Sequence, residues 1–153
     1  MNREITFREA AKPDLEQIVE MLSDDVLGSK RERFEIPLPS SYMKAFKAIE
    51  ADVNNELIVT EYDGRIIGVM QITFTPYITY QGGWRATIEG VRISSNARGM
   101  GVGTKMIEFA IARAKARDCH LIQLTTDKQR DEALQFYENL GFSATHHGMK
   151  MKL

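Results

Sequence analysis

A short loop with three alternating glycines, directly before a long amphipathic segment, constrains this chain more than any other feature. It reads Arg98-Gly99-Met100-Gly101-Val102-Gly103-Thr104 and follows an apolar, β-rich run over residues 84–93. Glycine has no Cβ atom to keep a ligand from the backbone, and the first turn of a helix carries free N–H groups that attract anions. The loop therefore predicts a phosphate- or pyrophosphate-binding turn, the alternative being glycines that only allow tight helix packing.

Two common phosphate-binding loops fit this spacing less well. A P-loop needs a Lys followed by Ser or Thr after a suitable glycine, and no such pair is present. A Rossmann loop has G-x-G-x-x-G spacing directly after a strand, whereas here the spacing is G-x-G-x-G and residues 94–98 intervene. Asp127 follows the next strand, as a ribose-binding acid would. The hairpin-linked strands before the loop nevertheless do not fit a Rossmann half.

Periodicity along the rest of the chain predicts a mixed α/β sheet in the order β-α-α-β-β-β-α-β-α-β. Asp63-Gly64 is typical of a hairpin turn and Gly141 of a left-handed helix end. We expect residues 25–40 to form a mobile surface connection. Strands are expected at 4–8, 56–62, 65–75, 84–93, 121–125 (central) and 143–153, and helices at 13–24, from a Ser40 or Ser41 cap onward, at 101–117 and at 131–140.

Composition is typical of one soluble domain spanning residues 1–153, with 43% hydrophobic and 27% charged residues. The net charge of −1 gives no global attraction to nucleic acid or to an anionic membrane. No apolar run reaches the roughly 20 residues that span a bilayer, and the charged start shows no secretory signal. The single cysteine, Cys119, cannot form an internal disulfide. We therefore expect a cytoplasmic enzyme or binding protein.

Two segments together resemble the signatures of the GCN5-related N-acetyltransferase (GNAT) superfamily. The run from Arg98 to Gly103 resembles the motif R/Q-x-x-G-x-G/A, and Ala133-Leu134-Gln135-Phe136-Tyr137-Glu138-Asn139-Leu140-Gly141-Phe142 resembles A-x-x-F-Y-x-x-x-G-F. The motifs stand in the family's order, one strand apart, and the order of elements is also similar. The resemblance implies a single-domain GNAT-like fold with a mixed central sheet flanked by helices. It also implies transfer of an acetyl group from acetyl-CoA to a primary amine.

The resemblance assigns the coenzyme to the glycine loop and to the strand before it. The backbone amides from Gly99 to Thr104 would hold the pyrophosphate of acetyl-CoA, with Arg98 at the entrance of the loop. The backbone of Val91, Arg92 and Ile93 would pair with the pantetheine arm and stabilise the developing oxyanion of the thioester. No covalent enzyme intermediate is required.

The alternation of apolar residues in the run over residues 84–93 shifts by one position at Glu89-Gly90. Apolar residues occupy even positions before this point and odd positions after it, which predicts a β-bulge at residues 89–91. The bulge would aim Glu89 into the cleft. Glu89 is then a candidate general base that takes a proton from the incoming ammonium group. The alternative is a solvent-facing glutamate on a strand.

The second motif supplies a candidate acid. Phe136 has core spacing with Ala133 and Leu140, and Tyr137 lies 100° further round the helix, so we expect it to point elsewhere. The resemblance implies that Tyr137 lies near the coenzyme sulfur and protonates the departing thiolate. The alternative is an aromatic packing residue with a solvated hydroxyl.

Other assignments stay open. The Asn that many relatives use to contact the coenzyme is missing from residues 125–130, where Asp127, Lys128 or Arg130 could replace it. His146-His147 lacks further ligands, so no metal is expected. The amine acceptor, which would enter near the first helices and residues 25–40, is not identified. A homodimer is expected by resemblance, and a non-catalytic acyl-CoA-binding or sensing domain is the alternative function.

Overall fold

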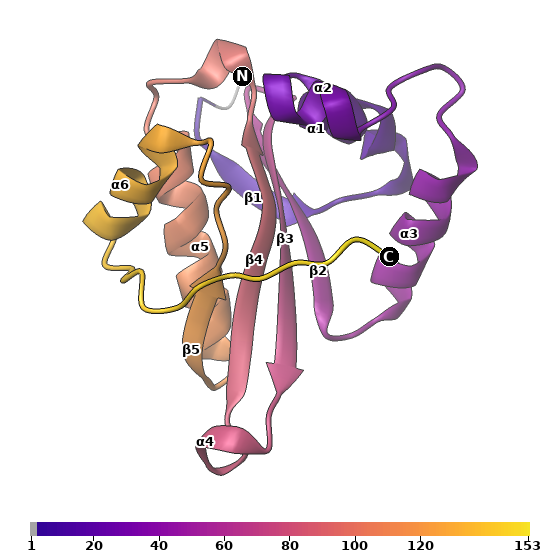
Figure 1. Cartoon of the computed structure of the whole chain (residues 1–153). Helices are drawn as coiled ribbons and strands as arrows, with labels where there is room; N and C mark the ends of the chain where they lie inside the picture. The colour runs from indigo at the N-terminus through magenta and orange to yellow at the C-terminus, as the bar shows by residue number, and fades with distance from the viewer. Residues whose placement is uncertain (1–2) are drawn as a thin grey trace.

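The computed structural model describes residues 3–153 and contains one mixed five-stranded sheet (Figure 1). The strands lie in the order β1-β2-β3-β4-β5. The first four are antiparallel to their neighbours, and β5 is parallel to β4. The fold is therefore the mixed α/β sheet that the sequence predicts. The five strands are β1 (Thr6–Glu9), β2 (Asn55–Tyr62), β3 (Arg65–Pro76), β4 (Trp84–Ile93) and β5 (Cys119–Leu124).

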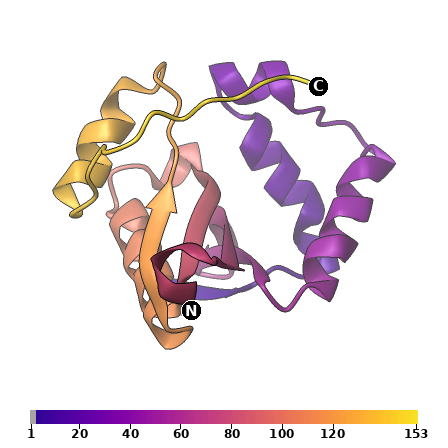
Figure 2. The same ribbon diagram turned by 60° about the horizontal axis from the view of Figure 1, so that its bottom comes forward.

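Helices cover both faces of this sheet (Figure 2). One group is formed by α1 (Leu15–Ser23), α2 (Val26–Arg31) and α3 (Ser40–Ala51), and the other by α5 (Val102–Ala116) and α6 (Asp131–Asn139). Among residues 3–153 no helix is long and apolar enough to cross a membrane. The remaining short helices are η1 (Lys12–Asp14), α4 (Thr79–Gly82) and η2 (Ser95–Ala97).

Alternating side chains in β3 explain the two layers, because successive residues of a strand point to opposite faces. Met70 and Ile72 pack into the core against α5, together with its residue Met106. Val69, which directly precedes Met70, packs on the other face against Ile18 of α1. These side chains are at most 2% exposed, so the central strands hold both helix layers.

Two local turns confirm the sequence prediction. Asp63 and Gly64 join β2 and β3 with φ angles of 51° and 74°, the left-handed conformation that a two-residue hairpin turn requires. Gly141 follows Leu140, the residue that ends α6, and has a φ angle of 100°; its N–H donates to the carbonyl of Glu138.

The segment 25–40 is more regular than predicted. It contains α2, whose first turn is capped because the Asp25 carboxylate accepts the N–H of Gly28. The expected serine cap of α3 is wrong. This helix begins at Ser40, Pro39 occupies the capping position, and no side chain caps it.

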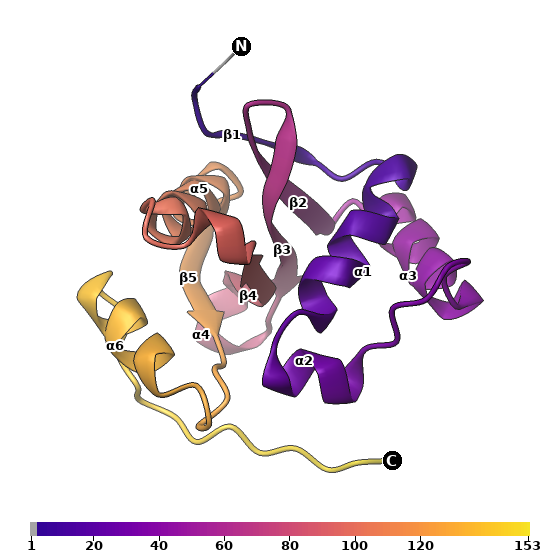
Figure 3. The same ribbon diagram turned by 90° about the horizontal axis from the view of Figure 1, so that it is seen from above.

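The predicted last strand is not formed. Residues 143–153 instead extend past the end of β5 towards α2 and α3 (Figures 1 and 3), with Met149 and Met151 more than 80% exposed. A strand requires a neighbour for its N–H and C=O groups, and this segment pairs with none of the described strands. As a result, β5 is an edge strand, and the prediction of a central position was wrong.

Candidate functional site

The candidate site lies where β4 and β5 separate. Their pairing runs from Trp84 with Cys119 to Ile88 with Leu124. Beyond this point β4 continues to Ile93, whereas the chain leaves β5 towards α6. Within the described residues, this part of β4 has a strand neighbour only on its β3 side. Its other edge can therefore hydrogen-bond an extended ligand.

A β-bulge occurs in the separated part of β4. Glu89 pairs with Gln71 and Arg92 pairs with Val69, so two residues of β4 face the single residue Met70 of β3. One of these two is Gly90, whose φ angle of 61° is left-handed and rarely adopted by other residues. The bulge predicted at residues 89–91 is thus confirmed.

The bulge changes which side chains share a face. Directly opposed residues of antiparallel strands lie on the same face. Glu89 and Arg92 therefore lie with Gln71 and Val69, on the face covered by α1, although they are three positions apart. Without the extra residue they would lie on opposite faces. Val91 and Ile93 pack on the other side, against the core near α5.

Two of the three loop glycines are needed for conformation. Gly99 and Gly101 have φ angles of 80° and 73°, and a Cβ atom at either position would meet nothing within 4 Å. Gly103 is different, because a Cβ atom there would lie 3.1 Å from Ile93 Cδ1 and 3.1 Å from Phe136 Cζ. The packing alternative therefore holds for Gly103 only, and the first two glycines border open space.

The start of α5 has the properties of an anion site. No side chain in the described part of the chain caps this helix, and Gly101 occupies its capping position. The N–H groups of its first turn thus have no side-chain acceptor, and the positive end of the helix dipole favours an anion. Arg98 and Met100 are exposed beside it, Thr104 is half-buried and Val102 is buried. A diphosphate group fits this arrangement of glycine backbone and helix start.

Tyr137 lies between two aromatic rings of its own motif. Its ring centroid is 5.1 Å from that of Phe136 and 5.8 Å from that of Phe142, both edge-on. It also packs against the core near α5, so the prediction that it points away from the core was wrong. Burial raises the pKa of Tyr137, and Arg130 and Arg92 partly oppose this effect. The phenol is therefore protonated at neutral pH, as a proton donor must be.

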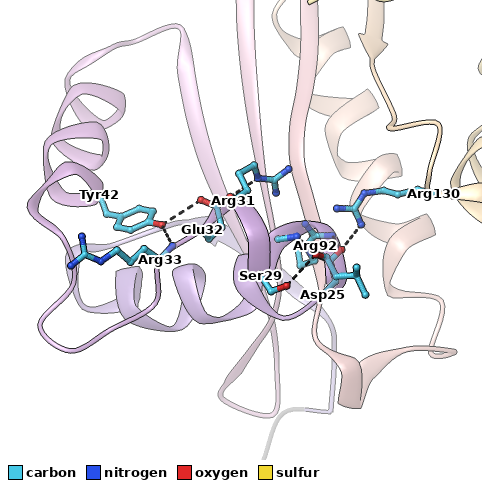
Figure 4. A network of polar contacts seen from close by, with 10 residues as sticks. Asp25, Ser29, Arg31, Glu32, Arg33, Tyr42, Arg92 and Arg130 are labelled. Atoms are coloured by element: carbon cyan, nitrogen blue, oxygen red, sulfur yellow. Dashed lines mark hydrogen bonds and ion pairs between the residues drawn. The ribbon is translucent and has the colours of Figure 1, made fainter. Parts of the chain in front are cut away.

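An ion cluster joins three elements beside the separated strands (Figure 4). Arg92 Nη1 of β4 lies 2.8 Å from Asp25 Oδ2, and Arg130 Nη1 lies 2.5 Å from the same oxygen. Sequence reasoning named both arginines but missed Asp25. The only local signal is its position before the first turn of α2, which is typical of a helix cap.

The other candidates take no part in this arrangement. Asp127 Oδ1 accepts the N–H of Gln129 in a local turn, at 2.8 Å, and Lys128 is exposed. His146 Nδ1 lies 2.6 Å from Thr145 Oγ1. No group of three His, Cys, Asp or Glu side chains that could hold a metal ion is assembled within residues 3–153.

Comparison with a family model identifies the class of protein. Residues 20–142 match the model of the acetyltransferase (GNAT) family. The chain therefore belongs to the GNAT acetyltransferase family, in agreement with its two motifs and with its sheet.

Three individual proteins are similar to this chain. A Bacillus halodurans C-125 protein described as a transcriptional regulator is 63% identical, with a TM-score of 0.96 over 98% of this chain and 100% of its own. A predicted acetyltransferase of Clostridium acetobutylicum, crystallised with acetyl-CoA, shares the fold with a TM-score of 0.74 and 22% identity, over 97% of this chain and 96% of its own. The glucosamine 6-phosphate N-acetyltransferase of Trypanosoma brucei brucei is 30% identical over 90 residues, which are 59% of this chain and 59% of that enzyme. The chain thus aligns with about three-fifths of this enzyme's length.

Proposed function

We propose that this chain is an acetyl-CoA-dependent N-acetyltransferase that acetylates a primary amine by direct attack. The observation that carries the proposal is the continuity of two ligand-binding features. The free edge of β4 leads through η2 and the loop with Gly99 and Gly101 to the uncapped start of α5. A ligand with an extended arm and a diphosphate, as coenzyme A has, matches both features.

The coenzyme is held mainly by backbone groups. The amides from Gly99 to Thr104 bind the diphosphate, and the exposed Arg98 adds a charge-assisted contact. The backbone of Val91, Arg92 and Ile93 pairs with the pantetheine arm. One N–H group of this edge donates to the thioester carbonyl as negative charge develops on its oxygen.

The chemistry needs one base and one acid. Glu89 accepts a proton from the ammonium group, and the free amine attacks the thioester carbonyl carbon. The C–N bond forms, the C–S bond breaks, and Tyr137 donates its proton to the departing thiolate. The second proton lost by the nitrogen balances the one that Tyr137 gives.

Gly101→Ala tests the coenzyme site. Its φ angle of 73° is unfavourable for alanine, so the loop must move and affinity for coenzyme A falls. Gly64→Ala is the matched control, because Gly64 has a φ angle of 74° and equally open space in the β2–β3 turn. Titration calorimetry with coenzyme A should separate the two variants. Equal affinity in both would contradict binding at the loop.

Acetyl transfer itself is measured as release of free thiol from acetyl-CoA in the presence of primary amines. Glucosamine 6-phosphate is the first amine to test, because the related trypanosome enzyme is named for it. The second candidate function is a non-catalytic acyl-CoA sensor. The description of the Bacillus halodurans relative as a transcriptional regulator favours it. A sensor would bind coenzyme A but release no thiol with any amine.

A further inference from the structure

The cluster of Asp25, Arg92 and Arg130 contains more positive than negative charge. Both guanidinium groups contact the same oxygen, Oδ2, while Oδ1 of Asp25 accepts the N–H of Gly28. The neighbouring Arg31 forms an ion pair with Glu32 at 2.7 Å, so this pair adds no net charge to the cluster. Two guanidinium groups therefore share one carboxylate, which leaves about one unmatched positive charge.

The Arg92 part of this cluster is largely removed from water, whereas the side chain of Arg130 is 29% exposed. The side chain of Arg92 is 11% exposed and that of Asp25 is 18% exposed. The Nε atom of Arg92 is buried and has no hydrogen-bond partner within residues 3–153. Burial lowers the pKa of Arg92, and the charge of Arg130 lowers it further. A buried cation without a full counter-charge is unfavourable, so the cluster is suited to an additional anion.

The cluster lies beside the proposed transfer site. The bulge puts Arg92 on the same face as Glu89, and their partners Val69 and Gln71 are two residues apart on β3, or about 7 Å. The charges of both arginines also act on the Tyr137 hydroxyl. The start of α5, where the coenzyme diphosphate is proposed to bind, belongs to the opposite helix layer.

We propose that Arg92 and Arg130 bind an anionic group, a carboxylate or a phosphate, that the amine acceptor carries. The acceptor would place its amine towards Glu89 and its anionic group between the two guanidinium groups. There the anionic group either displaces the Asp25 carboxylate or binds beside it. This inference rests on the proposed transferase function for the amine, whereas the anion site itself can be tested alone. The competing interpretation is an ion cluster that only ties α2 to β4.

The anion site is tested by the melting temperature with sodium phosphate, and separately with sodium acetate, against sodium chloride of equal ionic strength. We expect at least one of the two anions to stabilise the wild type. Arg130→Gln should lower the affinity for that anion about 10- to 100-fold, because hydrogen bonds between charged groups are lost. Arg65→Gln, at an exposed arginine next to the β2–β3 turn, is the matched control and should keep the effect, whereas Arg98→Gln reports any anion bound at the start of α5. Stabilisation by neither anion, or its loss in Arg98→Gln only, would overturn the proposal.

Asp25→Asn separates ligand binding from a purely structural role. The amide oxygen can still accept the N–H of Gly28, but the competing negative charge is gone. An anion-binding site then takes up phosphate or acetate more tightly than in the wild type. A cluster that serves only as a structural tie would lower the melting temperature without any gain in anion affinity, which would refute the proposal.

Turnover distinguishes this inference from the proposed function. Thiol release is compared for alanine against alaninamide and for glucosamine 6-phosphate against glucosamine, which separates the carboxylate from the phosphate. We expect kcat/KM to favour the anionic member of at least one pair about tenfold or more, and Arg130→Gln to remove this preference. Equal use of charged and neutral amines overturns the anion site but leaves the transferase. If no thiol is released but an anion still stabilises the protein in a way that depends on Arg130, the anion site is supported and the transferase function is refuted.

Discussion

The two halves of β4 have different neighbours and different backbone geometry. In residues 84–88 the strand is paired on both sides, and Ala86 and Ile88 are at most 1% exposed. In residues 89–93 it has lost β5, carries a bulge with a left-handed glycine, and exposes Glu89. One continuous strand thus contributes a packed core in one half and unpaired polar groups in the other.

The difference explains how a small sheet can hold a reactive site without losing its core. Hydrogen bonds to β3 continue through most of both halves, so the separated half stays fixed in position. The polar groups that β5 would otherwise satisfy remain available for a ligand. We therefore expect substitutions in the paired half to change stability and substitutions in the separated half to change activity.

The largest expected effect is that of Glu89→Gln on turnover. Loss of a general base lowers kcat about 10²- to 10⁴-fold. The melting temperature should change little, because the side chain is exposed. Stopped-time assays of thiol release, with thermal unfolding alongside, measure both quantities. Unchanged kcat would show that water alone removes the proton.

Ile88→Ala should show the opposite behaviour. Ile88 is 1% exposed in the main core, so its truncation lowers the free energy of unfolding by about 2–5 kcal/mol. Urea unfolding measures this loss. The kcat of the folded fraction should stay near that of the wild type. A specific loss of kcat, with little loss of stability, would contradict the division of β4 into two roles.

Tyr137→Phe extends the comparison to α6, whose Phe136 lies with Ile93 of the separated half beside Gly103. Loss of the proton donor lowers kcat about 10²-fold, with coenzyme affinity preserved. Because burial raises the pKa of Tyr137, its active, protonated form persists at neutral pH and is lost only as pH rises above the usual tyrosine range. The alkaline limb of kcat should therefore lie at high pH and disappear in the variant. Equal losses in kcat and coenzyme affinity would argue against the acid role.

The sequence predicted the features that depend on neighbouring residues. The glycine loop, the hairpin turn at Asp63-Gly64 and the bulge at residues 89–91 each follow from local conformation and side-chain phase. The GNAT family followed from two motifs that are each continuous in the chain, and the mixed sheet followed from the periodicity of apolar residues. The expected homodimer stays a prediction.

The sequence did not predict features that depend on distant contacts. Met149 and Met151 alternate as in a strand, but alternation cannot supply a partner, and residues 143–153 find none among the described strands. The cluster around Asp25 joins residues 67 and 105 positions apart. The fold brings the start of α2, the separated part of β4 and the start of α6 together, so no local pattern marks the cluster.

The smallest effect we expect is that of Gly90→Ala, which tests the boundary between the two halves directly. A Cβ atom there would meet nothing within 4 Å, so only the left-handed backbone is disfavoured, by about 1–2 kcal/mol. If the bulge persists, urea unfolding records this small loss and kcat/KM is kept, as for Gly64→Ala. If alanine removes the bulge, Glu89 and Arg92 can no longer share a face, and activity falls although stability recovers. A variant with unchanged stability and unchanged kcat/KM would mean that the left-handed bulge is not what brings these two side chains together.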